Sequence, residues 1–432
     1  MAGSVGASLL LQLGLLVSGV LTARLLGVEG RGYLVLLMLV PLALSPLATL
    51  GLPLAVVFEV SRVPLAARAI ARSVARPAVA QTVALVLVHA GALVVLLQDA
   101  PEEVQRAGAV SVAVGPAILG QHYALAILQG QGNFRAFNVL RLLPFLLNSL
   151  LVAAVFVFGL DDLALLALVW TATYAAAAVT TAVWARHALP REGESSPGPP
   201  LRTMIRFGSK ALLGSASPVE TFRIDQAVVG LFLSPAALGL YAAGLAFTNL
   251  PRLVALGVGA VAFPDVAART EPAAARRAMW RFAVLTLAAS SILVLGLGAV
   301  AGWLVPFFFG ASFEGAVPLT QILLVGAPFI AARRVLTDAS RGTGLAGIGS
   351  VGELASWIVL VPSVALGASV AGVTGVAAGL TVSAVVSALL LAAGVFLAQR
   401  RTVAGEVAAN GIAPTTPAGV PTPQPAREPG PV

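Results

Sequence analysis

The chain has 432 residues, of which 58% are hydrophobic and only 10% charged, with a formal net charge of +8. A soluble domain carries about 25% charged residues and cannot bury so much apolar surface, so this composition excludes a soluble globular protein. With no cysteine and three histidines, the sequence also excludes a disulfide framework and a thiolate metal site, and it argues against a zinc cluster.

Apolar stretches of about 20 residues recur along the chain, each long enough to cross a hydrocarbon layer of about 30 Å as a helix. The stretches are continuous and do not alternate as barrel strands do. The first has no basic n-region or cleavage site, so we expect an uncleaved span. The sequence thus predicts an all-α integral membrane protein with about twelve transmembrane helices. The expected spans cover residues 4–26, 33–58, 77–97, 104–129, 137–159, 163–185, 206–233, 236–262, 281–304, 316–337, 350–367 and 371–397.

The basic residues predict the orientation of the spans. Most Lys and Arg lie in the even-numbered loops and the tail, whereas the odd-numbered loops hold only Arg24, Arg31 and Arg106 together with most of the acidic residues found in loops between spans. Because positive residues near span ends stay in the cytoplasm, both termini should be cytoplasmic. The basic excess therefore reflects topology and contacts with anionic lipids, and we expect no nucleic-acid partner.

Two segments should lie outside the membrane. Residues 187–203 have the Pro, Gly, Ser and charge content of a flexible linker. They separate an N-terminal six-helix bundle, residues 1–186, from a C-terminal six-helix bundle, residues 204–399. The Pro-rich tail, residues 400–432, cannot bury enough apolar area to fold and should be disordered.

The two halves of the chain share a weak repeat. Gly32 and Tyr33 follow the first span as Gly239 and Tyr241 follow the seventh. Six spans per repeat is an even number, so the two copies should have the same orientation, related by an axis along the membrane normal.

The seventh span carries three ionisable residues, Glu220, Arg223 and Asp225. A charge at a helix centre costs about 2.5 to 3.5 kcal/mol on insertion scales, so these side chains must face protein or water. On a continuous helix Glu220 and Arg223 can pair along one face, while Asp225 lies on another face. Asp225 then needs a partner, which could be Arg252 or Arg24.

Pro218 lacks the N–H that would bond the carbonyl of Gly214, so we expect a kink in this span. We favour the interpretation that this span is a bent helix lining a charged aqueous cavity. The alternative is that its charged residues only form structural ion pairs between helices. Other embedded polar residues are also candidates for the cavity lining: Gln121, His122, Tyr123, Asn138, Arg141, Asn148, Asn249, Arg252 and Glu353.

Signatures of enzymes and ATPases are missing from the sequence. The sole lysine, Lys210, lies in RFGSKALLG and not in a phosphate-binding P-loop. No metalloprotease or hydrolase motif occurs, and the expected outer loops are short. We therefore expect neither an enzyme nor a bound cofactor or metal.

Residues 223–268 resemble the seventh and eighth spans of polysaccharide-biosynthesis flippases in the multidrug/oligosaccharidyl-lipid/polysaccharide exporter superfamily. The matching pattern is an Asp in span 7, a Gly-x-Tyr that opens span 8 and a Phe-Pro that closes it. ARLLGVEGRGYLVLL resembles the first outer turn of the family, and residues 313–362 resemble its tenth and eleventh spans. The residues that carry the pattern are Asp225, Gly239, Tyr241, Phe263, Pro264, Arg24, Gly27, Gly30 and Gly32.

The resemblance implies two six-helix bundles around a central cavity that opens alternately to each side. It also implies a substrate in which a polyprenyl pyrophosphate carries an oligosaccharide, moved across the cytoplasmic membrane for surface polysaccharide synthesis. A basic group can pair with the pyrophosphate while the lipid tail stays in the bilayer. The expected substrate site comprises Arg24, Arg223, Arg252, Glu220, Asp225 and Asn249, in a monomer surrounded by membrane lipids, and we hypothesise that Asp225 binds a coupling ion.

Three alternatives stay open. A cation-coupled multidrug exporter of the same superfamily favours an acidic residue in the middle of span 1, where this chain has Gln12 and Ser18. A lipid II flippase usually has fourteen spans. A membrane enzyme that polymerises or ligates polysaccharide would need a long outer loop with clustered Arg and His.

Overall fold

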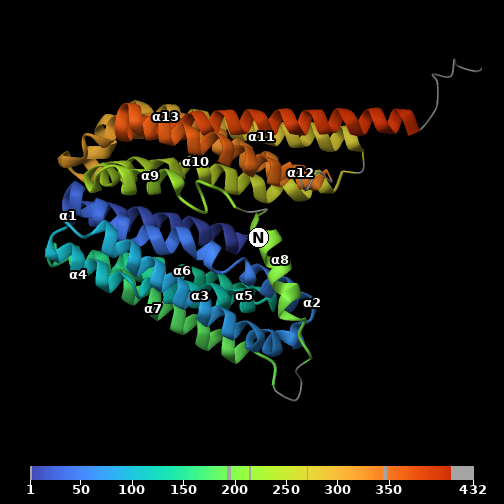
Figure 1. Cartoon of the computed structure of the whole chain (residues 1–432). Helices are drawn as coiled ribbons and strands as arrows, with labels where there is room; N and C mark the ends of the chain where they lie inside the picture. Colours follow the sequence, from blue (N-terminus) through green and yellow to red (C-terminus); the bar gives the residue numbers. More distant parts are fainter. Residues whose placement is uncertain (1, 192–195, 214–215, 270, 344–347, 410–432) are drawn as a thin grey trace, which may run out of the picture.

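The computed structural model describes residues 2–191, 196–213, 216–269, 271–343 and 348–409. Within these ranges the chain forms helices joined by turns and contains no strand, which confirms the all-α fold. Figure 1 shows the helices of the two halves as two layers, with α1 lying along the helices of the C-terminal half. Residues 192–195 of the expected linker and 410–432 of the expected tail lie outside the described residues.

The N-terminal half begins with α1, which is broken at Gly27. The backbone of Gly27 has a φ of 67°, a conformation that costs glycine little because it lacks a Cβ atom. This break is the turn expected between the first two spans. The remaining helices continue the bundle, and the elements are α1 (Ala2–Ala48), α2 (Leu52–Arg62), α3 (Ala67–Leu96), α4 (Glu102–Ser111), α5 (Val114–Gly130), α6 (Phe134–Val157) and α7 (Leu163–Ala188).

The C-terminal half ends in α13, a long helix broken at Ala371 and Gly372. The helix continues to Ala409, so the tail expected from residue 400 begins as helix. The elements after the linker are α8 (Leu201–Leu213), α9 (Ile224–Phe232), α10 (Pro235–Ala267), α11 (Pro272–Phe309), α12 (Ala316–Gly342) and α13 (Ile348–Ala409).

Among the described residues, nine helices are long and apolar enough to cross a membrane. Two of them, α1 and α13, are broken within their length and each corresponds to two expected spans. The shorter α8 and α9 take the place of the expected seventh span. The chain is therefore a multi-pass membrane protein, and the count of twelve stays a prediction.

The seventh span departs from the expected kinked helix. Helix α8 ends at Leu213, and α9 begins only at Ile224, after a segment of turns over residues 216–223. Proline cannot donate a helical hydrogen bond, and Arg223 has a left-handed φ of 50°, so a regular helix cannot pass through this segment. Because Glu220 and Arg223 do not share a helical face, the expected pair along that face does not form.

Helix α8 packs on the N-terminal half, although the C-terminal bundle was expected to begin at residue 204. The ring of Phe207 stacks on Phe58 of α2 with 4.3 Å between centroids. Met204 is fully buried against residues of α2 and α3. The chain therefore leaves the N-terminal half after α8, beyond the expected linker.

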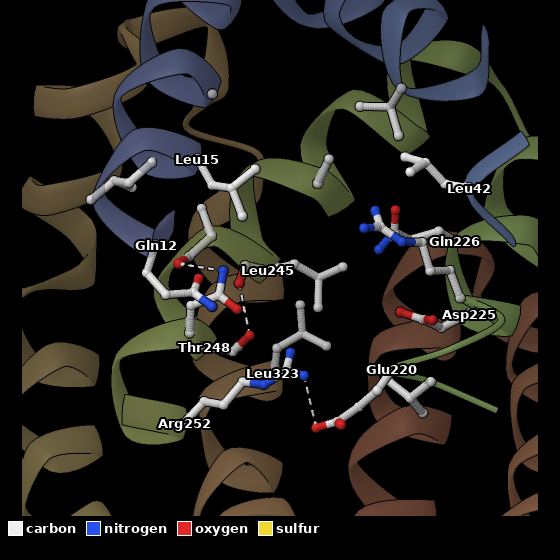
Figure 2. A pocket seen from close by; sticks show the side chains of 18 of the residues that line it. Gln12, Leu15, Leu42, Glu220, Asp225, Gln226, Leu245, Thr248, Arg252 and Leu323 are labelled. Atoms are coloured by element: carbon white, nitrogen blue, oxygen red, sulfur yellow. Dashed lines mark hydrogen bonds and ion pairs between the residues drawn. The ribbon is translucent and has the colours of Figure 1, made fainter. Parts of the chain in front are cut away.

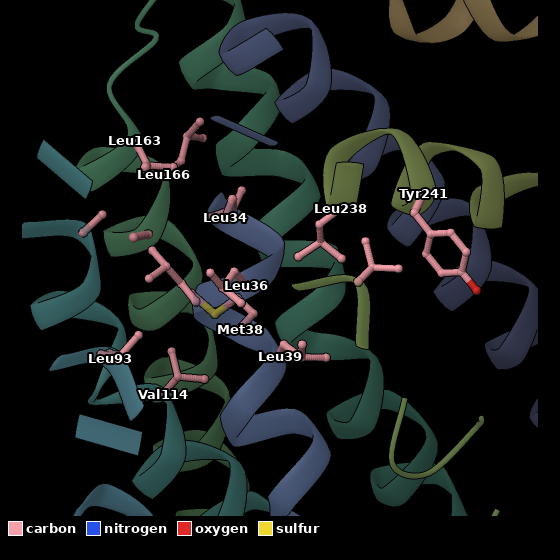
Figure 3. Packing of buried hydrophobic residues seen from close by; sticks show 14 of the residues in the cluster. Leu34, Leu36, Met38, Leu39, Leu93, Val114, Leu163, Leu166, Leu238 and Tyr241 are labelled. Carbon is pink, nitrogen blue, oxygen red and sulfur yellow. The ribbon is translucent and has the colours of Figure 1, made fainter. Parts of the chain in front are cut away.

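The largest apolar core joins the two halves through α1. Figure 3 shows Leu34 and Met38 of α1 among side chains of the N-terminal half, while Leu36 and Leu39 of α1 both lie against Gly230 of α9. At one end of this core the helices touch backbone to backbone. A Cβ atom on Gly32 would lie 1.7 Å from the carbonyl oxygen of Pro235, the first residue of α10. No side chain fits between the halves at this crossing.

Candidate functional site

A cavity of about 570 Å³ lies between the two halves of the molecule (Figure 2). On one side it is lined by α1, α6 and α7, and on the other by the segment of turns before α9 and by α9, α10, α11, α12 and α13. The structure therefore confirms the central cavity between two helical bundles that the resemblance implied.

The charges of the cavity lining are unequal. Arginine keeps its positive charge in proteins and is costly to hold within a membrane unless it faces water or an anion. The lining contains two carboxylates, those of Glu220 and Asp225, and five guanidinium groups, so it has a formal excess of positive charge. The five arginines are Arg31, Arg141, Arg223, Arg252 and Arg334.

Glu220 lies on the segment of turns and bridges two helices of the C-terminal half. Its Oε1 lies 3.1 Å from Nη2 of Arg252 on α10, and its Oε2 accepts a hydrogen bond from Nη1 of Arg334 on α12 at 3.0 Å. The three side chains are 24%, 34% and 37% exposed, respectively, so the group borders the cavity and is not sealed in a dry core. Figure 2 shows Glu220 pointing toward Arg252.

Asp225 lies in the first turn of α9, where the positive end of the helix dipole favours a carboxylate. It is 1% exposed, and its Oδ2 accepts a hydrogen bond of 2.9 Å from the hydroxyl of Tyr241. Its buried Oδ1 has no hydrogen-bond partner among the described residues. The partner of Asp225 is thus a tyrosine of α10, where the sequence predicted Arg252 or Arg24.

Arg24 was expected in the substrate site and does not line the cavity. It is exposed, its Nε donates a hydrogen bond of 2.6 Å to the carbonyl of Phe308, and its Nη2 donates to the carbonyl of Phe307. These carbonyls belong to the last turn of α11, which ends at Phe309. Cations favour helix C-termini because the last carbonyls lack partners within the helix, so Arg24 caps α11.

The other expected residues do line the cavity, from different elements. Arg223 precedes α9, and Asn249 and Arg252 lie one turn apart on α10. Of the further polar candidates, Arg141 lines the cavity. Asn148 instead donates a hydrogen bond of 2.6 Å from Nδ2 to the hydroxyl of Ser18, which ties α6 to α1.

Two arginines that the sequence did not predict in the site line the cavity. Helix α1 resumes directly after Gly27, so Arg31 lies on its second segment and reaches the cavity, where its Nη1 donates to the hydroxyl of Thr22 at 2.9 Å. Arg334, which the sequence did not single out, lines the cavity from α12. Arg31 follows Gly27 closely in the sequence. This short spacing is the sequence signal that Arg31 belongs to the resumed helix and not to a loop.

Several solved structures have the same fold. An inward-facing multidrug resistance transporter of the MATE family, in the MOP superfamily, is 15% identical with a TM-score of 0.68, covering 91% of this chain and 95% of that one. The lipid II flippase MurJ in an inward closed conformation is 14% identical with a TM-score of 0.70, covering 90% and 86%.

A third structure is a MOP superfamily transporter from Pyrococcus furiosus, described as having a binding pocket of reverse polarity that suggests a different function. It is 15% identical with a TM-score of 0.58, covering 93% of this chain and 94% of that one. No curated protein matches the chain by sequence.

The family described as polysaccharide biosynthesis protein matches residues 21–318, which is more than half of the chain. These structural neighbours are described as a transporter and a flippase, not as enzymes. The chain therefore belongs to the polysaccharide biosynthesis protein family and has the fold of the MOP transporter superfamily, as the sequence resemblance predicted.

Proposed function

We propose that the protein moves an oligosaccharide linked to polyprenyl pyrophosphate across the bacterial cytoplasmic membrane by alternating access, for the synthesis of a surface polysaccharide. The observation that carries this proposal is the excess of arginine over carboxylate in a cavity shared by both halves. A cavity that opens alternately to the two sides must be built from two bodies that move against each other, and both bodies contribute to this lining.

The chemistry of the cavity suits an anionic headgroup. Guanidinium groups bind phosphate oxygens through paired hydrogen bonds, and a site within a membrane strengthens this attraction. The cavity volume of about 570 Å³ is in the range of ligand pockets, which supports binding of a pyrophosphate and a first sugar while the lipid tail remains in the bilayer. We assign the pyrophosphate contact to Arg223 and Arg252, with Asn249 as a polar contact for the sugar.

Asp225 has a different role in this proposal. A carboxylate with one buried oxygen unpartnered in the described structure is a candidate for binding a coupling ion or a proton. In the proposed orientation, the end of the molecule that contains α2 and α8 faces the cytoplasm. The basic residues of these two helices then obey the positive-inside rule.

Lipid II translocation is the second candidate, because lipid II shares the anionic headgroup chemistry and MurJ shares the fold. Export of cationic drugs is disfavoured, since the cavity lining would repel a cation. The family match to polysaccharide biosynthesis favours the first candidate over both.

The test is substitution in a strain that depends on this chain for its surface polysaccharide. Arg252→Ala and Arg223→Ala should reduce surface polysaccharide and accumulate undecaprenyl-linked glycan on the inner leaflet. Arg269→Ala is the matched control, because Arg269 pairs with Asp265 on an exposed helix end and does not line the cavity. Unchanged polysaccharide in both cavity variants would overturn the site, and normal glycan distribution with altered lipid II would favour the second candidate.

A further inference from the structure

The anion position on two arginines of the cavity is occupied by a side chain of the protein itself. Glu220 places one carboxylate oxygen on Arg252 and the other on Arg334, at 3.1 and 3.0 Å. A phosphate group offers the same kind of acceptor, oxygens with a shared negative charge, at the same donor groups. An anionic ligand cannot make its best contacts with both guanidinium groups until the carboxylate has left.

The backbone around Glu220 permits this exchange. Glu220 lies in the turns between α8 and α9, so its side chain can leave the two arginines without breaking a helix. The ends of the segment are held separately against α13. The indole Nε1 of Trp357 donates a hydrogen bond of 2.7 Å to the carbonyl of Ala216, and the ring of Phe222 packs 5.4 Å from the ring of Trp357.

We infer that Glu220 is an intramolecular competitor of the anionic headgroup: it neutralises Arg252 and Arg334 while the cavity is empty and is displaced when the headgroup binds. This inference rests on the proposed function, because it concerns the affinity of that same site. When the headgroup binds, its phosphate oxygens replace the Glu220 carboxylate on Arg252 and Arg334. The headgroup therefore binds less tightly than it would if the two arginines had no carboxylate partner. The return of Glu220 then favours release of the headgroup.

Displacement of Glu220 also has a mechanical consequence. The carboxylate ties the segment of turns to α10 and to α12. Once the headgroup has replaced it, this tie is lost, while the contacts of Ala216 and Phe222 with Trp357 of α13 remain. The occupancy of the cavity is thus linked to the freedom of the segment that joins α8, on the N-terminal half, to α9 in the C-terminal half.

A static ion pair and a competitor make opposite predictions for loss of the carboxylate charge. Removing one partner of a structural ion pair lowers stability and leaves ligand affinity the same or weaker. Removing a competitor frees both arginines and strengthens binding. Glu220→Gln keeps the size of the side chain and removes its charge, so the sign of the change in affinity separates the two roles.

The experiment measures binding of inorganic pyrophosphate to the purified full-length protein by titration calorimetry in magnesium-free buffer. Glu220→Gln should bind pyrophosphate about tenfold more tightly than the unsubstituted protein. Glu353→Gln is the matched control. Glu353 forms an ion pair with Arg333 at 3.5 Å, and neither residue lines the cavity, so loss of this carboxylate charge should leave pyrophosphate affinity unchanged. If Glu220→Gln does not fold, Glu220→Asp, whose shorter side chain spans the two arginines poorly, should show a smaller gain.

The outcomes distinguish this inference from the proposed function. Equal or weaker pyrophosphate binding in the Glu220 variant, with binding lost in Arg252→Ala, would overturn the competitor role and leave the proposed function standing. Absence of binding in the unsubstituted protein and in the Glu220 variant alike would overturn both. Tighter binding in the Glu220 variant together with slower glycan translocation in cells would support both.

Discussion

Gly32 of α1 and Gly239 of α10 pack against each other's helix backbone where the two halves of the molecule cross. A Cβ atom on Gly239 would lie 2.0 Å from the carbonyl oxygen of Val28, a distance that no real side chain occupies. The same two positions mark the start of the second and eighth expected spans in the internal repeat. The repeat thus brings its two equivalent glycines together, and their contact closes the space between the halves at this end.

Adding a methyl group at this crossing should force the halves apart. Gly239→Ala should lower the free energy of unfolding by about 1 to 3 kcal/mol and reduce glycan translocation, because overpacking displaces backbone. Gly302→Ala, on α11, is the control: nothing lies within 4 Å of a Cβ atom there, and alanine is the better helix former. Thermal unfolding of both variants checks this, and equal stability would refute the close crossing.

Arg24 should contribute to stability and not to substrate binding. Arg24→Gln removes a charged donor from the final carbonyls of α11 and should cost about 1 kcal/mol of unfolding free energy, with pyrophosphate affinity unchanged. Thermal unfolding and calorimetry on the same preparation measure the two effects. If Arg24→Gln lost pyrophosphate affinity at an unchanged free energy of unfolding, Arg24 would belong to the binding site.

Tyr241 and Asp225 should be energetically coupled. Tyr241→Phe removes the hydroxyl that donates to the Oδ2 of a buried carboxylate and should destabilise the protein by about 1 to 3 kcal/mol. In an Asp225→Ala background the same change should cost much less, because the acceptor is gone. A double-mutant cycle measured by thermal unfolding gives the coupling, and additive costs would show that the hydrogen bond contributes nothing.

The sequence predicted the class of fold well because membrane insertion imposes a strong pattern. The bilayer requires long apolar stretches within each span, and the orientation of the spans sets the charges of the loops. Both requirements can be read directly from the composition of each segment. The charged segment of the seventh span and its place beside a cavity could be predicted for the same reason. Pro218 marked the right position for an interruption, and only the extent of the interruption was underestimated.

The pairing of charges could not be predicted because it depends on tertiary packing. Arg24 and Arg31 lie seven residues apart on either side of Gly27, yet one caps α11 and the other enters the cavity. The direction in which α1 resumes after Gly27 decides between these outcomes, and no local pattern encodes it. Glu220 likewise meets Arg334, which is distant in sequence, and not the nearby Arg223.

The central claim is that the charged segment borders a water-filled, positively charged cavity between the two halves. The chain has no cysteine, so single cysteines can be introduced without background. Thr248→Cys lines the cavity, and Leu285→Cys lies on the outer, apolar surface of α11, where Leu285 is 51% exposed. In open membrane sheets, both variants are treated with water-soluble thiosulfonates of opposite charge.

The measurement is the labelling rate at each cysteine. We predict that the anionic sulfonatoethyl reagent labels Thr248→Cys faster than the cationic trimethylammonium reagent does, and that pyrophosphate slows this reaction. Leu285→Cys, facing lipid, should react with neither. No labelling at Thr248→Cys by either reagent, as at Leu285→Cys, would contradict the account, because the charged residues would then lie in dry contacts between helices.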